Sequence, residues 1–156
     1  MIEFNSWIIP TEKELRKEYK SEYIHQIKPK YGDIFPTLQD WYDSIGNTGE
    51  VIRLYGTEIM KRFKRRETME DLIKLIRKFR SYPKYRNEAT VKALYNRFLN
   101  NEEIYMPIIY RDKESGLIVV SGNTRINISY MLGIKPEVVC FEKQEKNNEY
   151  RTNNTS

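Results

Sequence analysis

The sequence has little of what disulfide scaffolds and zinc centres require. Its 156 residues include one cysteine, Cys140, and one histidine, His25. A single cysteine excludes an internal disulfide and is typical of proteins in a reducing compartment, so we expect a cytoplasmic location. A zinc site needs about four nitrogen or sulfur ligands, so no metal-binding residue is predicted. Cys140 lies in an apolar run, where a buried and inert thiol is the expected state.

Long apolar runs are also missing. No run approaches the roughly 20 residues that span a bilayer, and the first residues lack the basic-then-apolar layout of a signal peptide. We therefore expect no membrane partner. Charged residues make up 31% and apolar residues 39% of the chain, which favours a folded protein over a disordered one. The length predicts a single domain over residues 1–142, and the polar residues 143–156 predict a flexible tail.

The first two thirds of the chain carry helical patterns. Thr11 opens a capping box, apolar residues follow at every fourth position, and Pro29 is expected to end this helix. Thr37 is expected to start a second helix that stops at Gly46. Residues 50–55 alternate between polar and apolar side chains and predict a strand. In all, helices are predicted over 11–27, 37–46, 68–79 and 88–99.

Residues 106–141 predict a strand, a turn, a strand, a helix and a last strand. Short β-branched and apolar runs indicate strands over 107–110, 117–121 and 137–141. A short helix is expected over 124–132, ended by Gly133. Together with the helices expected within residues 1–101, this pattern predicts an α+β fold in which several helices flank a small mixed sheet.

The junction Ser121-Gly122-Asn123-Thr124-Arg125 passes directly from a predicted strand into a predicted helix. The first backbone N–H groups of a helix lack intrahelical partners and carry partial positive charge, so they can bind an anion. Gly122 would let the backbone approach a ligand closely, and Arg125 would add charge-assisted donors to a phosphate. We expect the Arg125 side chain to point toward the ligand rather than into the core. The alternative is structural: Asn123 or Thr124 caps a core helix, and Arg125 pairs with a surface carboxylate.

The order of these motifs resembles the core of the ParB/sulfiredoxin superfamily. The shared pattern is a G-x-x-R turn at Gly122–Arg125, then Leu-Gly-Ile at residues 132–134, then a strand around Val138 and Val139. The Ser-Gly-Asn-Thr-Arg form of the turn is most similar to the phage branch of the superfamily. The resemblance covers about residues 106–141, and it implies that the turn holds the phosphates of a nucleotide.

The activities of two members of the superfamily are not expected for this chain. Sulfiredoxins carry a catalytic cysteine inside the turn, whereas this chain has Asn123 and Thr124 there, so sulfiredoxin chemistry is excluded. ParB proteins continue after this fold with a helix-turn-helix domain. Here the sequence ends soon after the closing strand, so chromosome partitioning is not expected.

The resemblance implies a nucleotide-binding phosphotransferase that uses ATP or another nucleoside triphosphate, with Mg²⁺ as a further expected ligand. Phage relatives are proposed kinases in DNA base modification, so DNA or a modified base is the acceptor that the resemblance suggests, in a host-cell cytoplasm. Phosphoryl transfer requires mainly positioning and charge stabilisation, which such a turn can supply. The phosphate-binding residues implied are Ser121, Gly122, Asn123, Thr124 and Arg125.

Three other functions remain open at this stage. The first is a non-enzymatic module that binds a nucleotide or DNA through the same turn. The second is a phage protein that binds a host protein. The third is a nuclease, although the sequence shows no carboxylate cluster of the kind that a two-metal nuclease needs. The sequence leaves the oligomeric state undetermined.

Two segments carry further candidate residues. One is a basic run that can contact the phosphates of DNA or RNA, or that is simply a solvated face. Its cations are Lys61, Arg62, Lys64, Arg65 and Arg66. The other is the connector over residues 80–88, in which Arg86 would contact phosphate and Glu88 would act as a catalytic base or magnesium ligand. The alternative for this segment is an ordinary connector between two helices.

Two carboxylates in the turn before the second strand of the core, Asp112 and Glu114, are also candidates for the catalytic base. A plain turn role is the alternative for both.

Overall fold

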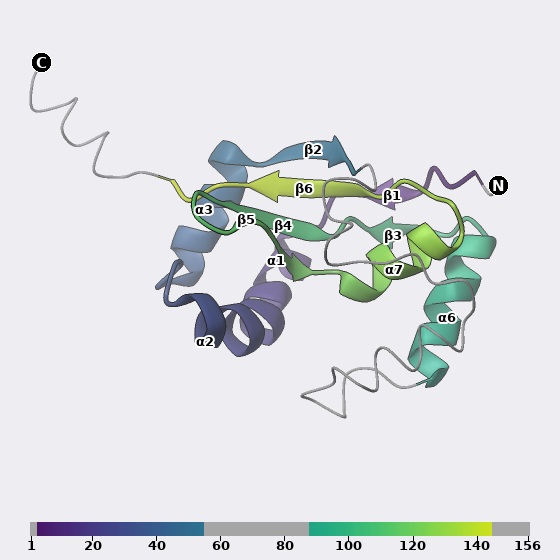
Figure 1. Ribbon diagram of the computed structural model, residues 1–156, viewed down its shortest axis with the longest axis horizontal. Helices are drawn as coiled ribbons and strands as arrows, with labels where there is room; N and C mark the ends of the chain where they lie inside the picture. Colours follow the sequence, from purple (N-terminus) through teal and green to yellow (C-terminus); the bar gives the residue numbers. More distant parts are fainter. Residues whose placement is uncertain (1–2, 55–87, 145–156) are drawn as a thin grey trace, which may run out of the picture.

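The computed structural model describes residues 3–54 and 88–144 of the chain. Within these residues helices pack with a four-stranded mixed sheet, which confirms the α+β class expected from the sequence. In Figure 1 the helices α1 to α3 lie to one side of the sheet, and α6 and α7 lie near one end of it. The strand order is β2 (Glu50–Arg53), β6 (Glu137–Phe141), β4 (Ile108–Asp112), β5 (Gly116–Ser121).

The three strands predicted in the C-terminal part share this sheet. β4 and β5 form an antiparallel hairpin, and β4 pairs in parallel with β6. On the other side of β6, β2 pairs with it antiparallel, so the strand expected over residues 50–55 is confirmed for 50–53. Since side chains alternate along a strand, each strand contributes residues to both faces of the sheet.

The larger hydrophobic core lies on the face that the N-terminal helices cover. Phe141 of β6 meets the rings of Phe35 and Trp41, and Tyr110 of β4 meets Phe35, with ring centroids 5.2 to 5.4 Å apart. Trp41 is completely buried, and its indole N–H donates to the carbonyl oxygen of Leu15 at 3.1 Å. Aromatic packing therefore fixes the helices against the sheet.

A smaller core lies on the opposite face of the sheet. Its buried members are Leu54, Ile109, Val119, Ile126, Val138 and Cys140. Cys140 is 1% exposed, so the buried thiol expected from the sequence is confirmed. The helix α7 (Asn123–Met131) contributes Ile126 to this core and Ile128 to the larger one. Both cores therefore hold the helix that follows β5.

The first predicted helix is present, but it does not end at Pro29. α1 (Glu12–Glu18) continues into a nine-residue π-helix, η1 (Tyr19–Ile27), and then into α2 (Lys28–Tyr31). Pro29 lies in the first turn of α2, where the missing N–H of a proline is tolerated. Gly32, with a φ of +90°, ends the helical segment instead.

The sequence pattern does not distinguish the π-helix from an α-helix. Tyr19, Tyr23 and Ile27 are buried at a spacing of four, and both helix types place such residues near one face. The two tyrosine rings stack with centroids 5.2 Å apart. The Tyr19 hydroxyl donates to the carbonyl oxygen of Phe35 at 2.7 Å, and the Tyr23 oxygen accepts from the Phe35 N–H at 2.8 Å.

The second helix is also longer than predicted. α3 (Leu38–Thr48) begins where expected, because the Thr37 hydroxyl oxygen accepts a hydrogen bond from the Asp40 N–H at 3.1 Å. The expectation that Gly46 stops it is wrong, since α3 passes through this residue and ends before Gly49. A glycine inside a helix costs only about 1 kcal/mol relative to alanine, which packing of the helix can offset.

The remaining helices agree with the prediction. α6 (Glu88–Leu99) confirms the helix expected over 88–99, and α7 matches the one expected over 124–132 to within one residue. A second, two-stranded parallel sheet, β1 (Trp7–Ile8) with β3 (Ile104–Tyr105), was not predicted. Strands of two residues are too short to show a period.

Several predicted features lie outside the described residues. These are the helix over 68–79, the basic run Lys61, Arg62, Lys64, Arg65 and Arg66, the connector residue Arg86, and the tail beyond residue 144.

Candidate functional site

The predicted junction from strand to helix is present at Gly122, between β5 and α7. Gly122 has a φ of +106°, which side-chain-bearing residues rarely adopt. A Cβ atom at this position would lie 2.5 Å from the Cβ of Pro107. The glycine is therefore required for the junction to pack against Pro107. The sequence suggested a different reason, close approach to a ligand.

The start of α7 differs from the starts of α1 and α3. The latter two are capped by the hydroxyl groups of Thr11 and Thr37, which accept from the N–H groups of Glu14 and Asp40. The N-cap of α7 is Gly122, and no side chain caps the helix. The structural alternative in which Asn123 or Thr124 is the cap is thus not found. Without a side-chain cap, the partial positive charge of the first turn can act on an anion.

Arg125, in the first turn of α7, has a side chain that is only 14% exposed. Its guanidinium donates to the carbonyl oxygen of Tyr105 at 2.6 Å and to the hydroxyl oxygen of Ser121 at 2.8 Å. It also lies 3.9 Å from a carboxylate oxygen of Glu18. This placement differs from the expectation that the side chain leaves the protein toward a ligand. Through these contacts the Arg125 side chain connects β3, the end of β5 and the end of α1.

Two glutamates of α1 lie beside this arginine. Glu18 is 7% exposed, and Glu14 precedes it by one helical turn. Burial raises the pKa of the Glu14 carboxyl, and a hydrogen bond and repulsion from Glu18 raise it further, against the opposing charges of Lys17 and Arg125. Sequence reasoning missed both glutamates, because more than a hundred residues separate them from the turn. The only sequence feature that pointed to these glutamates was the acidic start of α1. Acidic residues are common there in any helix, so this feature did not indicate a site.

The end of β5 and the helix α7 also bury polar side chains. Ser121, Thr124, Asn127 and Ser129 are all less than a tenth exposed. The Asn127 amide donates to the carbonyl oxygen of Asn123 at 2.7 Å, so it lies along the first turn of the helix. Its Oδ1 atom is buried without a hydrogen-bond partner, which costs about 1–3 kcal/mol. Asn127 was not among the predicted site residues.

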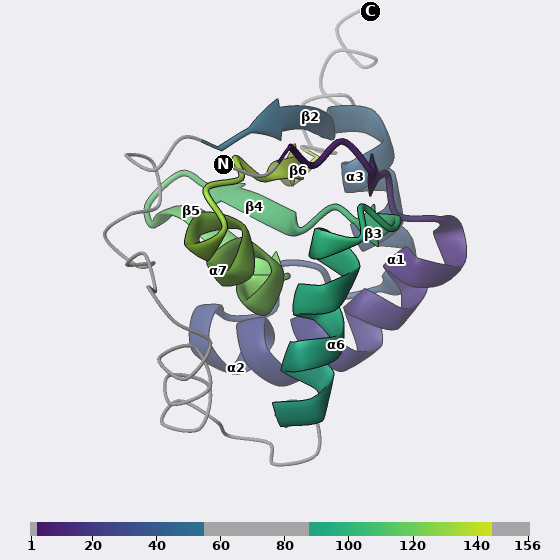
Figure 2. The ribbon, with the colours of Figure 1, turned by 90° about the vertical axis from the view of Figure 1, so that its right-hand side faces the viewer.

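The five consecutive residues predicted to bind phosphate, 121–125, all lie at the junction of β5 and α7. Ser121 ends β5, Gly122 is the cap of α7, and Asn123 is exposed at the first position of the helix. Thr124 and Arg125 are the next two residues. Figure 2 shows α7 next to α6, at the end of β5.

Of the other predicted residues, Asp112 lies elsewhere in the fold. Asp112 ends β4 at the hairpin turn, where its Oδ2 atom accepts from the N–H groups of Glu114 and Ser115 at 3.2 and 2.8 Å. This is the turn role given as the alternative for Asp112. Glu88 is the first residue of α6, and its side chain lies outside the described part of the structure, as does Arg86.

Within residues 3–54 and 88–144, no group of three or more His, Cys, Asp or Glu residues could hold a metal ion. In the same residues no helix is long and apolar enough to cross a membrane. Comparison of the chain with protein-family models, curated proteins and solved structures found no significant match. The resemblance to the ParB/sulfiredoxin superfamily therefore stays a prediction.

Proposed function

We propose that this protein is a nucleotide-binding phosphotransferase with a fold of ParB/sulfiredoxin type. In this proposal residues 121–125 bind the phosphates of ATP or another nucleoside triphosphate. The observation that carries the proposal is the start of α7, which has no side-chain cap and lies next to the Arg125 guanidinium.

The proposed reaction transfers the γ-phosphoryl group of the nucleotide to a hydroxyl group on DNA or on a modified base. The hydroxyl oxygen bonds to phosphorus while the bond from phosphorus to the bridging oxygen breaks, so that ADP leaves. The hydroxyl proton passes to a base or to water, and Glu88 is one of the candidate bases suggested by the sequence. The helix start and Arg125 would stabilise charge on the phosphoryl oxygens. Mg²⁺ held mainly by the phosphates would need few protein ligands.

Nucleotide binding is the first test of this proposal. ATP or CTP with magnesium should raise the melting temperature of the wild-type protein, because a ligand that binds only the folded state stabilises it. In calorimetric titrations Arg125→Lys should bind roughly tenfold more weakly, since lysine has the charge without the planar fork of donors. Arg111→Lys, at the other end of the β4–β5 hairpin, is the matched control and should bind like wild type. A protein that shows no shift with any nucleotide would contradict the proposal.

A second candidate is a non-enzymatic module that binds a nucleotide or DNA phosphates at the same turn. The position of Asp112 favours it, because this candidate base closes the hairpin turn away from α7. Incubation with ATP labelled in the γ-phosphoryl group and DNA that carries hydroxymethylated bases separates the two. Transfer of label to the DNA supports the enzyme, and nucleotide binding with no transfer supports the module.

A further inference from the structure

The two edges of the four-stranded sheet differ in how they are covered. At one edge, β5 packs against the helix η1, and its residues 118–121 are buried. At the other edge, β2 pairs with β6, and within residues 3–54 and 88–144 no strand pairs with its outer side. β2 is the uppermost strand of the sheet in Figure 1, and its apolar residue Val51 is 46% exposed. An open edge strand is a template for pairing with another strand.

The backbone of β2 directs alternate residues toward β6 and away from it. The Leu54 N–H donates to the carbonyl oxygen of Pro136, in the residue just before β6, at 2.8 Å. In an antiparallel ladder every second residue bonds to the same neighbour, so Ile52 also bonds toward β6. The residues between these positions, Val51 and Arg53, therefore direct their N–H and C=O groups to the outer side of the sheet.

A second copy of the chain can meet both outward residues at once. In an antiparallel pair related by a two-fold axis, Val51 lies opposite the partner's Arg53, and Arg53 lies opposite the partner's Val51. Each such pair exchanges both of its backbone hydrogen bonds. Ile52 then lies opposite the partner's Ile52, with Cα atoms about 4.5 Å apart at this non-hydrogen-bonded position. Because Ile52 packs against the smaller core, the pairing would join the smaller cores of two copies.

The charges of β2 favour antiparallel pairing of two copies. Glu50 begins the strand and Arg53 ends it. Antiparallel pairing places the acidic start of one strand beside the basic end of the other, whereas parallel pairing in register would place like charges opposite each other. In the antiparallel register Glu50 faces the partner's Leu54, so no two like charges lie directly opposite.

We propose that the outer edge of β2 is an interface at which two copies of this chain pair in antiparallel orientation, so that their sheets become one continuous sheet. The interface lies at the edge of the sheet opposite to β5 and to the turn that follows it, so the inference is independent of the proposed function. A four-residue strand is too short to bury the roughly 1,200 Å² of small stable interfaces, so the dimer should be weak and depend on protein concentration.

Sedimentation velocity of the full chain over a range of concentrations measures the dimer, and charged substitutions at Val51 test the register. Val51→Arg places a cation opposite the partner's Arg53 at two symmetric positions, so the dissociation constant should rise roughly tenfold. Val51→Glu places an anion there, so the constant should fall roughly threefold. Ile9→Arg and Ile9→Glu are the matched controls, because Ile9 is an apolar residue that is 63% exposed and lies outside β2. Both controls should dimerise like wild type.

A cysteine on the two-fold axis gives a second, independent measurement. Ile52→Cys should form a disulfide with its own copy under mild oxidation, because a Cα separation of about 4.5 Å lies within the range of disulfides. Val51→Cys is the control and should cross-link much more slowly, since it faces the partner's Arg53 instead of its own copy. The native Cys140 is 1% exposed and should not take part.

A wild-type chain that sediments as a monomer at every concentration would overturn the inference. Equal effects of Val51→Glu and Val51→Arg, or equal cross-linking of the two cysteine variants, would also overturn it, because the copies would then meet through another surface or register. If Ile52→Cys does not fold, the Val51 variants decide the question, since this side chain is exposed. A monomer that binds a nucleotide would overturn this inference and leave the proposed function intact.

Discussion

The two ends of the β4–β5 hairpin each carry an arginine, and the two arginines have opposite surroundings. Arg125 lies at the end where Ser121 pairs with Ile108, and Arg111 lies at the end where it pairs with Leu117. The side chain of Arg125 is 14% exposed, whereas that of Arg111 is 45% exposed. Arg125 makes hydrogen bonds of 2.6 and 2.8 Å to neutral oxygens, in addition to its ion pair.

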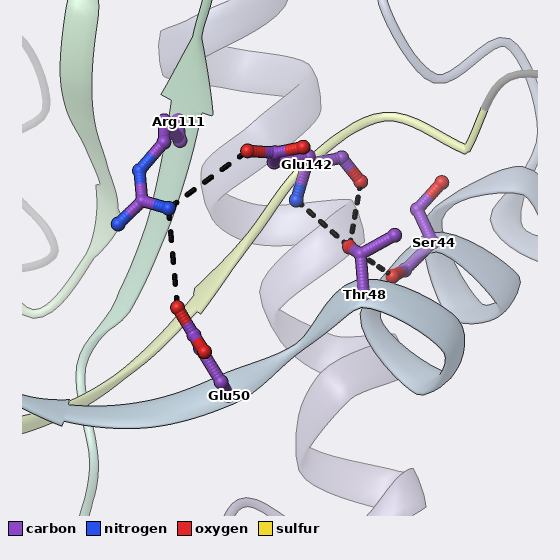
Figure 3. A network of polar contacts seen from close by, with 5 residues as sticks. All are labelled: Ser44, Thr48, Glu50, Arg111 and Glu142. Atoms are coloured by element: carbon purple, nitrogen blue, oxygen red, sulfur yellow. Dashed lines mark hydrogen bonds and ion pairs between the residues drawn. The ribbon is translucent and has the colours of Figure 1, made fainter.

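Arg111 belongs to an open network at the other end, shown in Figure 3. Its guanidinium lies 3.9 Å from a carboxylate oxygen of Glu50 and 3.8 Å from one of Glu142, both beyond hydrogen-bonding distance. The close bonds there belong to Thr48. Its hydroxyl lies 2.7 Å from the carbonyl oxygen of Ser44, and the same oxygen accepts from the Glu142 N–H at 2.8 Å.

The surroundings of an arginine, rather than the residue type, therefore determine its contribution to stability. Water screens the charges around Arg111, so its ion pairs contribute little. At Arg125 the nearby carboxylate and hydroxyl groups are buried, so loss of the guanidinium would leave them without compensation. The buried end is therefore both the candidate anion site and a region on which the stability of the fold depends. Mutations should lower the free energy of unfolding by different amounts at the two ends.

The largest effect is expected for Arg125→Ala. This change leaves the buried Glu18 carboxylate without its opposite charge and removes the bonds to Tyr105 and Ser121. It should lower the free energy of unfolding by about 3–5 kcal/mol, the usual cost of breaking a buried ion pair. Urea unfolding followed by tryptophan fluorescence measures the loss, because Trp41 is completely buried in the folded protein. A loss below that of Arg111→Ala would remove the distinction between the two ends.

This expectation reverses one drawn from the sequence. A guanidinium that points toward a ligand could be removed with little loss of stability, and only binding would suffer. The three protein contacts of Arg125 now predict that stability and binding are lost together. Arg125→Lys is for this reason the better variant for binding experiments, since it keeps a charge beside Glu18.

An intermediate effect is expected for Thr48→Val at the exposed end. The substitution keeps the shape of the side chain but removes the oxygen that joins the end of α3 to the residue after β6. Water can replace part of these bonds, so the free energy of unfolding should fall by about 0.5–1.5 kcal/mol. The same urea titration measures it. A loss as large as that of Arg125→Ala would mean that the exposed network, rather than the buried one, holds the sheet to the helices.

The sequence predicted the elements of this fold better than it predicted their ends. Strands with β-branched runs and helices with apolar stripes were found because their periodicity is local. The ends at Pro29 and Gly46 were wrong, because packing of the whole helical segment outweighs the preference of a single residue. Strand β3 was missed because two residues carry no period.

The candidate site was predictable only in part, for a similar reason. The turn at residues 121–125 is contiguous, so its glycine and arginine could be recognised together. Glu18 and Asn127 could not, since one comes from a distant helix and the other is an amide within a buried helix. Their relation to Arg125 and to the first turn of α7 exists only after the chain has folded.

The smallest effect is expected for Arg111→Ala. Both of its ion pairs are exposed and longer than 3.5 Å, with Glu50 and Glu142 side chains 61% and 55% exposed. Exposed pairs of this kind contribute about 0.2–1 kcal/mol, and salt screens them. The free energy of unfolding should therefore fall by less than about 1 kcal/mol at low salt, and wild type and variant should converge as salt is added. Arg125→Ala should keep most of its deficit at high salt, because its charges are buried. If the two variants respond to salt in the same way, the surroundings of Arg125 are as open to solvent as those of Arg111, and the contrast between the two ends of the hairpin does not hold.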